Sequence, residues 1–132
     1  MKQTTWSNEM ALDVPAMDRS HHVLFGDLSG LGALPEPAFR THFETMIVDL
    51  EHDFLTEDEW MDRIDYRQTL SHREEHAVIL SALHHTHSKV MAGDVEFGRV
   101  VVVSLCAWLV DHIATMDLPL AFAIRRAGAE YS

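Results

Sequence analysis

Seven ionisable residues of this chain occupy positions where the helical pattern calls for apolar side chains. Asp53 and Glu57 are four residues apart, as are His72 and His76, so on a helix each pair lies about 40° apart around the axis and about 6 Å along it. Each pair can therefore direct two side chains at one object. Imidazoles mixed with carboxylates favour iron, manganese or zinc over calcium or magnesium. The candidate metal ligands are His21, Asp53, Glu57, His72, His76, His112 and Asp117.

This number of ligands indicates more than one ion. Burying an unpaired charged group costs several kcal/mol or forces the group to become neutral. Seven ligands are too many for one ion of usual coordination, and they suit two ions bridged by carboxylates, as in di-iron sites inside helix bundles. Without metal, we expect the crowded carboxylates to repel one another and take up protons.

Each candidate ligand also has an ordinary structural explanation. A single histidine on an apolar face is more often a hydrogen-bonded core residue than a ligand. Asp117 lies two residues before Pro119 and could cap a short helix over 118–126. Asp53 and Glu57 could be solvated if their helix rotated, but the rotation would expose more apolar surface than it saves. The occurrence of ionisable residues on four apolar stripes together favours the metal site.

The other six histidines fall outside this candidate site. His87 lies about three helical turns beyond His76, too far to join the same site. The remaining five fall off the apolar stripes and are expected at the surface: His22, His42, His52, His84 and His85.

Four helices are predicted to position the ligands. Glycine and proline divide the chain into a leader, four long segments and a tail, with breaks near Pro15, at 30–37, at 65–71, at 93–94 and at Pro119. Apolar residues recur at spacings of three and four in each long segment, which is typical of amphipathic helices. Helices of about 15 to 29 residues with short connections predict an all-α fold. We expect one domain over 1–132, an antiparallel up-down-up-down four-helix bundle with an N-terminal leader and a short C-terminal helix.

Local signals predict where these helices begin and end. Pro37 can open the second helix, and Ser71 with Glu74 forms a capping box for the third. Gly93 supplies a stop for the third helix, and Asp94 can cap the fourth.

Composition excludes several classes of partner. With 10 Lys and Arg against 21 Asp and Glu, the net charge of −11 makes nucleic acid and anionic membrane surfaces poor partners. The longest strongly apolar stretch, 100–110, is too short to span a bilayer. Cys106 has no partner for an internal disulfide, and residues 1–10 lack a signal-peptide pattern, so we expect a cytoplasmic protein.

Taken together, these residues resemble the hemerythrins, specifically the short bacterial ones, over nearly the whole chain. The order, the spacing and the helix assignments all agree with the family pattern. The chain departs from the pattern at Asp53, which stands where the family has a histidine, and at Ser20, where glutamine is usual. The matching motifs are Trp6, Met17-Asp18-Arg19-Ser20-His21-His22-Val23-Leu24-Phe25, Asp53-Phe54-x-x-Glu57-Asp58-x-x-Met61, His72-x-x-x-His76 and Trp108-x-x-x-His112-Ile113-x-x-x-Asp117.

The resemblance implies a ligand set and an oxygen site. Three histidines would hold one iron, His21 and Asp53 would hold the other, and two carboxylates would bridge them with an oxo or hydroxo group. The second iron would keep an open position for O₂. Leu24, Trp108 and Ile113 match the residues that line the oxygen pocket of the family, although ordinary core packing also explains them. The three histidines are His72, His76 and His112, and the bridging carboxylates are Glu57 and Asp117.

The predicted function is reversible binding of O₂ by a non-haem di-iron protein, for storage, delivery or sensing. No nucleophile elbow, phosphate loop or output domain is visible, which favours a binder over a transferase. The alternative is a di-iron enzyme that reduces O₂, peroxide or nitric oxide, because Asp53 gives the site three carboxylates instead of two. A second alternative is a bundle that holds structural zinc or a single metal ion. The oligomeric state is left open by the sequence.

Overall fold

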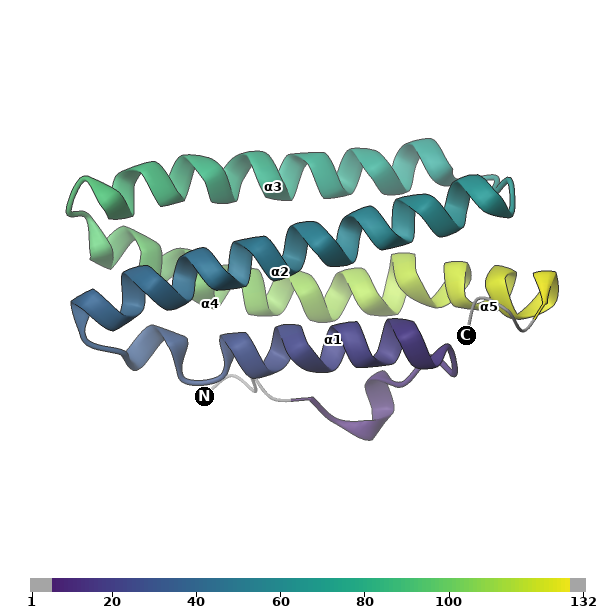
Figure 1. The fold of residues 1–132 in the computed structure, drawn as a ribbon, viewed down its shortest axis with the longest axis horizontal. Helices are drawn as coiled ribbons and strands as arrows, with labels where there is room; N and C mark the ends of the chain where they lie inside the picture. Colours follow the sequence, from purple (N-terminus) through teal and green to yellow (C-terminus); the bar gives the residue numbers. More distant parts are fainter. Residues whose placement is uncertain (1–5, 129–132) are drawn as a thin grey trace.

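The computed structural model describes residues 6–128, which form helices and connections and contain no strand (Figure 1). The first five residues of the predicted leader lie outside this range. The elements are η1 (Asn8–Met10), α1 (Pro15–Leu28), η2 (Leu31–Ala33), α2 (Glu36–Arg63), α3 (Thr69–Met91), α4 (Val95–His112), η3 (Ile113–Asp117) and α5 (Leu118–Ala127). The prediction of an all-helical bundle is confirmed.

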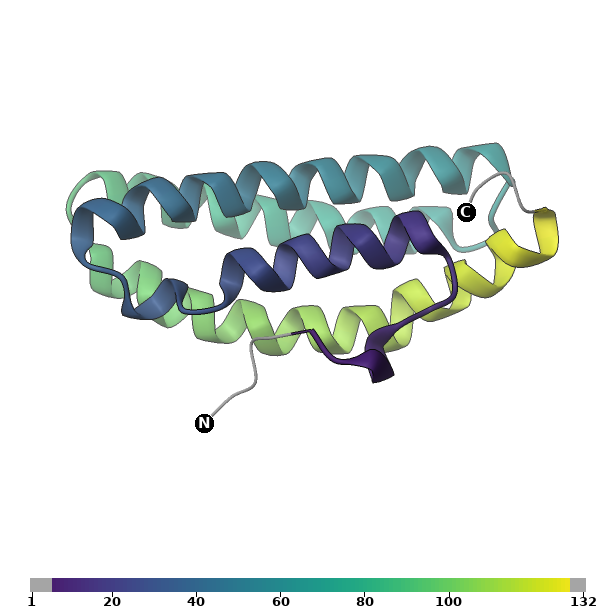
Figure 2. The ribbon, with the colours of Figure 1, turned by 60° about the horizontal axis from the view of Figure 1, so that its bottom comes forward.

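The long helices lie side by side along the long axis of the molecule. Successive helices from α1 to α4 run in opposite directions in Figure 1, and in Figure 2 α1 lies in front, between α2 and α4. Helix α1 packs on α2, α2 on α3 and α3 on α4. Their apolar faces meet in a core that contains Phe25, Phe39, Phe43 and Phe54, all almost inaccessible to solvent.

The connection between α3 and α4 brings these helices close together. Gly93 has a φ of +111°, a conformation that glycine adopts without strain, and it ends α3 as predicted. The Asp94 side chain accepts a hydrogen bond from the backbone N–H of Phe97 at 3.1 Å, so the predicted cap of α4 is confirmed. At Gly98, a Cβ atom would lie 2.6 Å from Val90, which shows how tightly α4 packs here.

Two predicted helix boundaries are wrong. Helix α3 begins at Thr69 rather than at Ser71, whose hydroxyl donates to the carbonyl of Gln68 at 3.1 Å instead of capping the helix. Pro119 does not interrupt the fourth helix, because it lies in the first turn of α5, where its missing N–H is not needed. Helical structure therefore continues from α4 through η3 into α5.

This continuous helix bears on the expectation that no segment is long enough to span a bilayer. Residues 95–127 form a helix of 33 residues that is long and apolar enough to cross a membrane by length and composition alone, with a mean hydropathy of 1.6 over its best window. The sequence expectation considered only residues 100–110. In the bundle, the inner side of this helix supplies Leu105, Leu109 and Ile113 to the core, and 39% of the window is buried, whereas Val100 and Val103 are exposed.

Candidate metal centre

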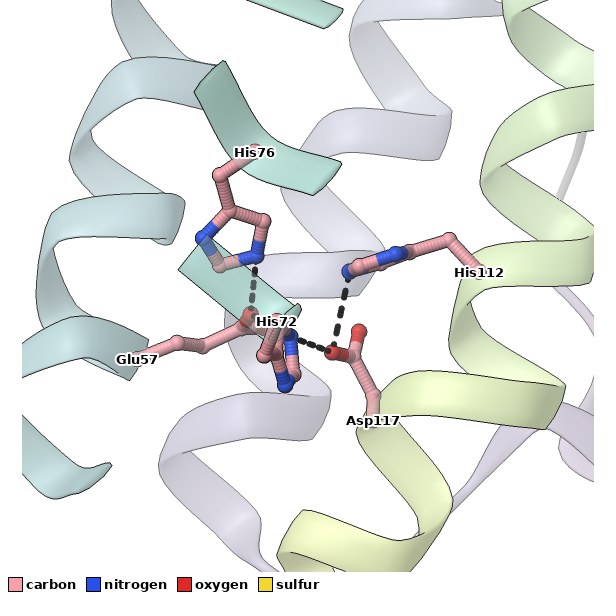
Figure 3. A group of neighbouring side chains, drawn as sticks. All are labelled: Glu57, His72, His76, His112 and Asp117. Atoms are coloured by element: carbon pink, nitrogen blue, oxygen red, sulfur yellow. Dashed lines mark ion pairs between the residues drawn. The ribbon is translucent and has the colours of Figure 1, made fainter. Parts of the chain in front are cut away.

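The structure brings all seven candidate ligands into the core of the bundle, and none of them is more than 3% exposed. They form two groups in which the possible ligand atoms all lie within 4.8 Å of one another, and Glu57 belongs to both. The larger group, drawn in Figure 3, contains Glu57, His72, His76, His112 and Asp117. The smaller group contains His21, Asp53 and Glu57.

In the larger group, three imidazoles converge on one side of two carboxylates. His76 Nε2 lies 3.1 Å from Glu57 Oε1, and His72 Nε2 lies 3.4 Å from the same oxygen. Asp117 Oδ1 lies 3.2 Å from the Nε2 atoms of both His72 and His112 (Figure 3). These three histidines therefore share Oε1 of one carboxylate and Oδ1 of the other.

The remaining oxygen of each carboxylate faces His21 on α1. His21 Nε2 lies 3.0 Å from Asp117 Oδ2 and 3.4 Å from Glu57 Oε2. Glu57 and Asp117 each divide their two oxygens between His21 and the three-histidine group. A carboxylate that bridges two metal ions presents its oxygens in this way.

The π-helix η3 is what allows Asp117 to reach this position. His112 and Asp117 are five residues apart, so on a regular α-helix they would point about 140° away from each other. The wider turn over Ile113–Asp117 brings both side chains to the inner face. Asp117 does precede α5, but its side chain makes no capping hydrogen bond. The alternative role of Asp117 as a helix cap is therefore wrong.

Polar residues outside the seven orient several ligands. Asp58 Oδ1 lies 3.2 Å from His76 Nδ1, and Glu75 Oε1 lies 2.8 Å from His112 Nδ1. A Nδ1–H donated to a carboxylate fixes the ring and leaves Nε2 free to bind a metal. Sequence reasoning gave neither carboxylate a role, because both lie on the polar side of the apolar stripes. Asp58 does stand in the matching motif, and Glu75 is signalled only by its position next to a candidate ligand.

Most of the inward-facing atoms lack hydrogen-bond partners despite their short separations. Buried polar atoms without partners are rare in folded proteins, so each one needs an explanation. Two ligand atoms about 2.1 Å from one ion and at right angles are about 3 Å apart, close to the separations found here. The residues present therefore fit a pair of metal ions. The unpartnered atoms include both oxygens of Glu57, Oδ1 of Asp117 and Nε2 of His21, His72, His76 and His112.

Without metal, protons would compensate part of this charge. Burial alone would lower the pKa of His72, but the Asp117 and Glu57 carboxylates outweigh it and raise the pKa to about 9. Burial and the nearby Asp117 would raise the pKa of Glu57, but its three histidine neighbours lower it to about 2. Burial, followed by the charge of Glu57, raises the pKa of Asp53 well above its usual value. The direction of the pKa shift agrees with the expected proton uptake at Asp53 and opposes it at Glu57 and Asp117, whose pKa values are lowered.

The other histidines lie where the sequence predicts them. The five that fall off the apolar stripes, including His52 and His84, are exposed, and His84 Nε2 lies 2.6 Å from Glu51 Oε2. His87 belongs to neither candidate group, and its ring stacks on Phe43 with centroids 6.4 Å apart.

Aromatic rings cover the three-histidine side of the centre. Trp108 stacks on the His112 ring with centroids 4.5 Å apart, and Phe54 stacks on His76 at 3.8 Å. A groove of about 400 Å³, lined mostly by apolar side chains, runs between α3 and α4 and ends beside Trp108. Of the three residues predicted to line an oxygen pocket, Leu24 and Ile113 are buried and Trp108 is half-buried, and their role in binding O₂ stays a prediction.

A helical bundle with a buried cluster of imidazoles and carboxylates defines a candidate metal-binding protein. The chain is 26% identical over 125 residues to a bacteriohemerythrin of Ralstonia nicotianae (strain ATCC BAA-1114 / GMI1000). The similarity covers 95% of this chain and 91% of that protein. No protein-family model matches the chain. The relative and the buried cluster together support the hemerythrin-like assignment.

Proposed function

We propose that this protein holds two iron ions in its core and binds O₂ reversibly, for storage, delivery or sensing. One iron would be held by three histidines and the other by His21 and Asp53, with two carboxylates and an oxo or hydroxo group as bridges. The division of the Glu57 and Asp117 oxygens between the two histidine groups is the observation that supports this proposal most strongly. The three histidines are His72, His76 and His112.

When bound, a pair of iron ions supplies the two electrons that O₂ takes up on binding and returns on release. The protein itself orients the ligands and excludes water. Asp58 and Glu75 hold two imidazole rings with Nε2 inward. Leu24, Trp108 and Ile113 would offer an apolar lining that suits O₂ or a similar small diatomic ligand or peroxide. We assign no catalytic residue.

Iron analysis combined with anaerobic absorption spectra tests this function. We expect two iron ions per chain and a spectral change on admitting O₂ that reverses when O₂ is removed. His72→Ala should lower the iron content, whereas His85→Ala, which removes an exposed histidine of the same helix, should leave it unchanged. A single ion per chain, or a spectral change that removal of O₂ does not reverse, would contradict the proposal.

The runner-up function is a di-iron enzyme that reduces O₂, peroxide or nitric oxide. The buried carboxylate of Asp53 favours it, because a site with three carboxylates has more negative charge and a harder ligand set than one with two. Sustained consumption of peroxide or O₂ in the presence of an electron donor would distinguish an enzyme from a carrier. Structural zinc, the third alternative, would be recognised by metal analysis.

The wider setting of this function is also a proposal. We expect a single domain over 1–132 with up-down-up-down topology, a leader and a C-terminal helix, located in the cytoplasm. The net charge of −11 argues against nucleic acid and anionic membranes as partners.

A further inference from the structure

The two metal positions proposed above differ in the chemistry of their ligands. The position beside α3 and α4 has the imidazoles of three histidines, with Glu57 and Asp117 as shared carboxylates. The position beside α1 has one imidazole, from His21, and the carboxylate of Asp53 in addition to the same two bridges. The first set is rich in nitrogen and the second is rich in oxygen. Imidazole ligands suit zinc and iron, whereas carboxylates suit harder ions such as manganese.

Asp53 is held in place by a residue of the neighbouring helix. The Ser20 hydroxyl, on α1, donates a hydrogen bond of 2.6 Å to Asp53 Oδ1, on α2. Asp53 is only 2% exposed, so no water shell competes with this bond. The bond holds the Asp53 carboxylate, which offers a possible ligand oxygen within 4.8 Å of the ligand atoms of His21 and Glu57. Ser20 is thus placed to act as a positioning residue for Asp53.

We propose that Asp53, positioned by Ser20, makes the α1 position favour hard divalent cations such as Mn²⁺ over Zn²⁺ more strongly than the three-histidine position does. The inference rests on the two-metal function proposed above and adds a difference in selectivity between its positions. It concerns the two residues at which the chain departs from the hemerythrin pattern, and the direct contact between Ser20 and Asp53 makes them a pair.

A sequential metal titration tests this selectivity without measuring any activity. Apo protein first receives one equivalent of Zn²⁺, which should fill the nitrogen-rich position. It is then titrated with Mn²⁺, and the free and bound Mn²⁺ are followed by electron paramagnetic resonance. In a parallel titration, a second equivalent of Zn²⁺ competes with a chelator of known affinity. We expect the wild-type chain to bind about one Mn²⁺ after the first Zn²⁺.

The decisive variant is Asp53→His, for which the two metals should respond in opposite directions. Its Mn²⁺ affinity should fall and its affinity for the second Zn²⁺ should rise, because an imidazole replaces a carboxylate. Uptake of the second Zn²⁺ also shows that the variant is folded. Asp53→Asn, which keeps the shape and removes the charge, should lose Mn²⁺ affinity as well. Equal changes for both metals in Asp53→His, or no change, would overturn the selectivity.

Variants at Ser20 test the positioning role. Ser20→Ala should weaken Mn²⁺ binding by roughly 10- to 100-fold, the usual effect of removing a residue that orients a ligand. Ser20→Thr keeps the hydroxyl and should retain the affinity, and Ser81→Ala, at an exposed position of α3, is the matched control. Wild-type Mn²⁺ affinity in Ser20→Ala would overturn the role of Ser20. A wild-type chain that binds one ion in total, of any kind, would instead overturn the two-metal function and this inference with it.

Discussion

The two halves of the candidate metal centre differ in how firmly their ligands are held. One half contains His72, His76 and His112, and the other contains His21 and Asp53. In the three-histidine half, the rings of His76 and His112 are held by carboxylates at their outer nitrogens and are covered by Phe54 and Trp108. The outer nitrogen of His72 has no hydrogen-bond partner, and in the other half the same is true of His21, the single histidine there. In that half, Asp53 is held by a residue that is not itself a candidate ligand, because it accepts a hydrogen bond from the hydroxyl of Ser20.

This difference suggests that the two halves have different roles. Two of the three rings in the first half are braced, which restricts the geometry in which they hold an ion. The other half has fewer protein ligands and no braced ring, so it adapts more easily when an external ligand arrives. We therefore expect the three-histidine half to govern metal retention and the His21 and Asp53 half to govern reactivity.

The largest effect is expected where the two halves meet. Glu57 belongs to both groups, so Glu57→Gln, which nearly preserves shape, should reduce metal content from two ions to less than one per chain. Metal analysis after gel filtration measures this effect. Glu59→Gln, an exposed position of the same helix, is the control and should keep both ions. Retention of one full ion by Glu57→Gln would show that the halves are independent.

Removal of metal should have the next largest effect, and it should grow with pH. In the apo protein, the carboxylates raise the pKa of His21 and His76 above their usual values and that of His72 to about 9. A histidine whose pKa is raised by folding stabilises the protein below pH 6.5 and loses that contribution as the pH rises through its folded value. Asp53, whose pKa is also raised, changes stability in the same direction.

The melting temperature of the apo protein should therefore fall between pH 6.5 and pH 9, by roughly 3–5 °C for each kcal/mol lost. Metal needs unprotonated ligands, so the loaded protein should not follow this fall. Calorimetric scans of both forms at several pH values measure the difference. An apo form that becomes more stable toward pH 9 would contradict the assigned pKa directions.

A smaller effect is expected from replacing Asp53, the carboxylate of the half that we expect to govern reactivity. In the proposed di-iron site, Asp53 would add a negative charge beside the second iron, which in a poorly solvated core would favour ferric over ferrous iron. Asp53→His should slow the oxidation of the ferrous, two-iron protein in air several-fold. Absorption spectra recorded over time after mixing with O₂ measure this rate. An unchanged or faster rate would remove Asp53 from control of the redox balance and weaken the enzyme alternative.

A change in metal affinity, with both ions still bound at saturation, should come from the residues that brace the three-histidine half. Asp58→Asn and Glu75→Gln keep a hydrogen-bond acceptor and lose only the charge, so each should weaken metal binding by about tenfold, the low end for such residues. Competition with a chelator gives these affinities. Glu74→Gln, an exposed neighbour of Glu75, is the control. Variants indistinguishable from the control would show that the braces do not contribute to metal retention.

Much of the fold and the candidate ligand group was predictable because the same pattern encodes both. Ionisable residues such as His21 and Glu57 interrupt stripes of apolar residues, and burial of those stripes brings the ionisable residues together. The cap at Asp94 was also predictable, because its bond joins residues three positions apart. Local chemistry and helical periodicity were sufficient for these features.

Features that depend on long-range contacts or on departures from the regular helix were not predictable. The bond between Ser20 and Asp53 joins residues 33 positions apart, and the one between Glu75 and His112 joins residues 37 apart. The π-helix was not predicted because the helical periodicity used for prediction assumes 3.6 residues per turn throughout. The capping box at Ser71 failed because a helix that has already begun at Thr69 leaves it no cap to fill.

The wide turn of η3 determines which way the side chains of α5 face. One residue beyond the regular α-helical repeat rotates Asp117 inward, and it rotates the apolar side of α5, with Leu120, Ala121 and Ile124, by the same angle. The inner surface of the tail helix and the bridging carboxylate are therefore in register with each other. Deleting one residue from 113–116 would leave His112 and the carboxylate four residues apart, which a regular α-helix places about 40° apart on one face. An insertion would instead turn the carboxylate and the apolar side of α5 away together by about 100°, so insertions in this short stretch are less tolerable than single deletions.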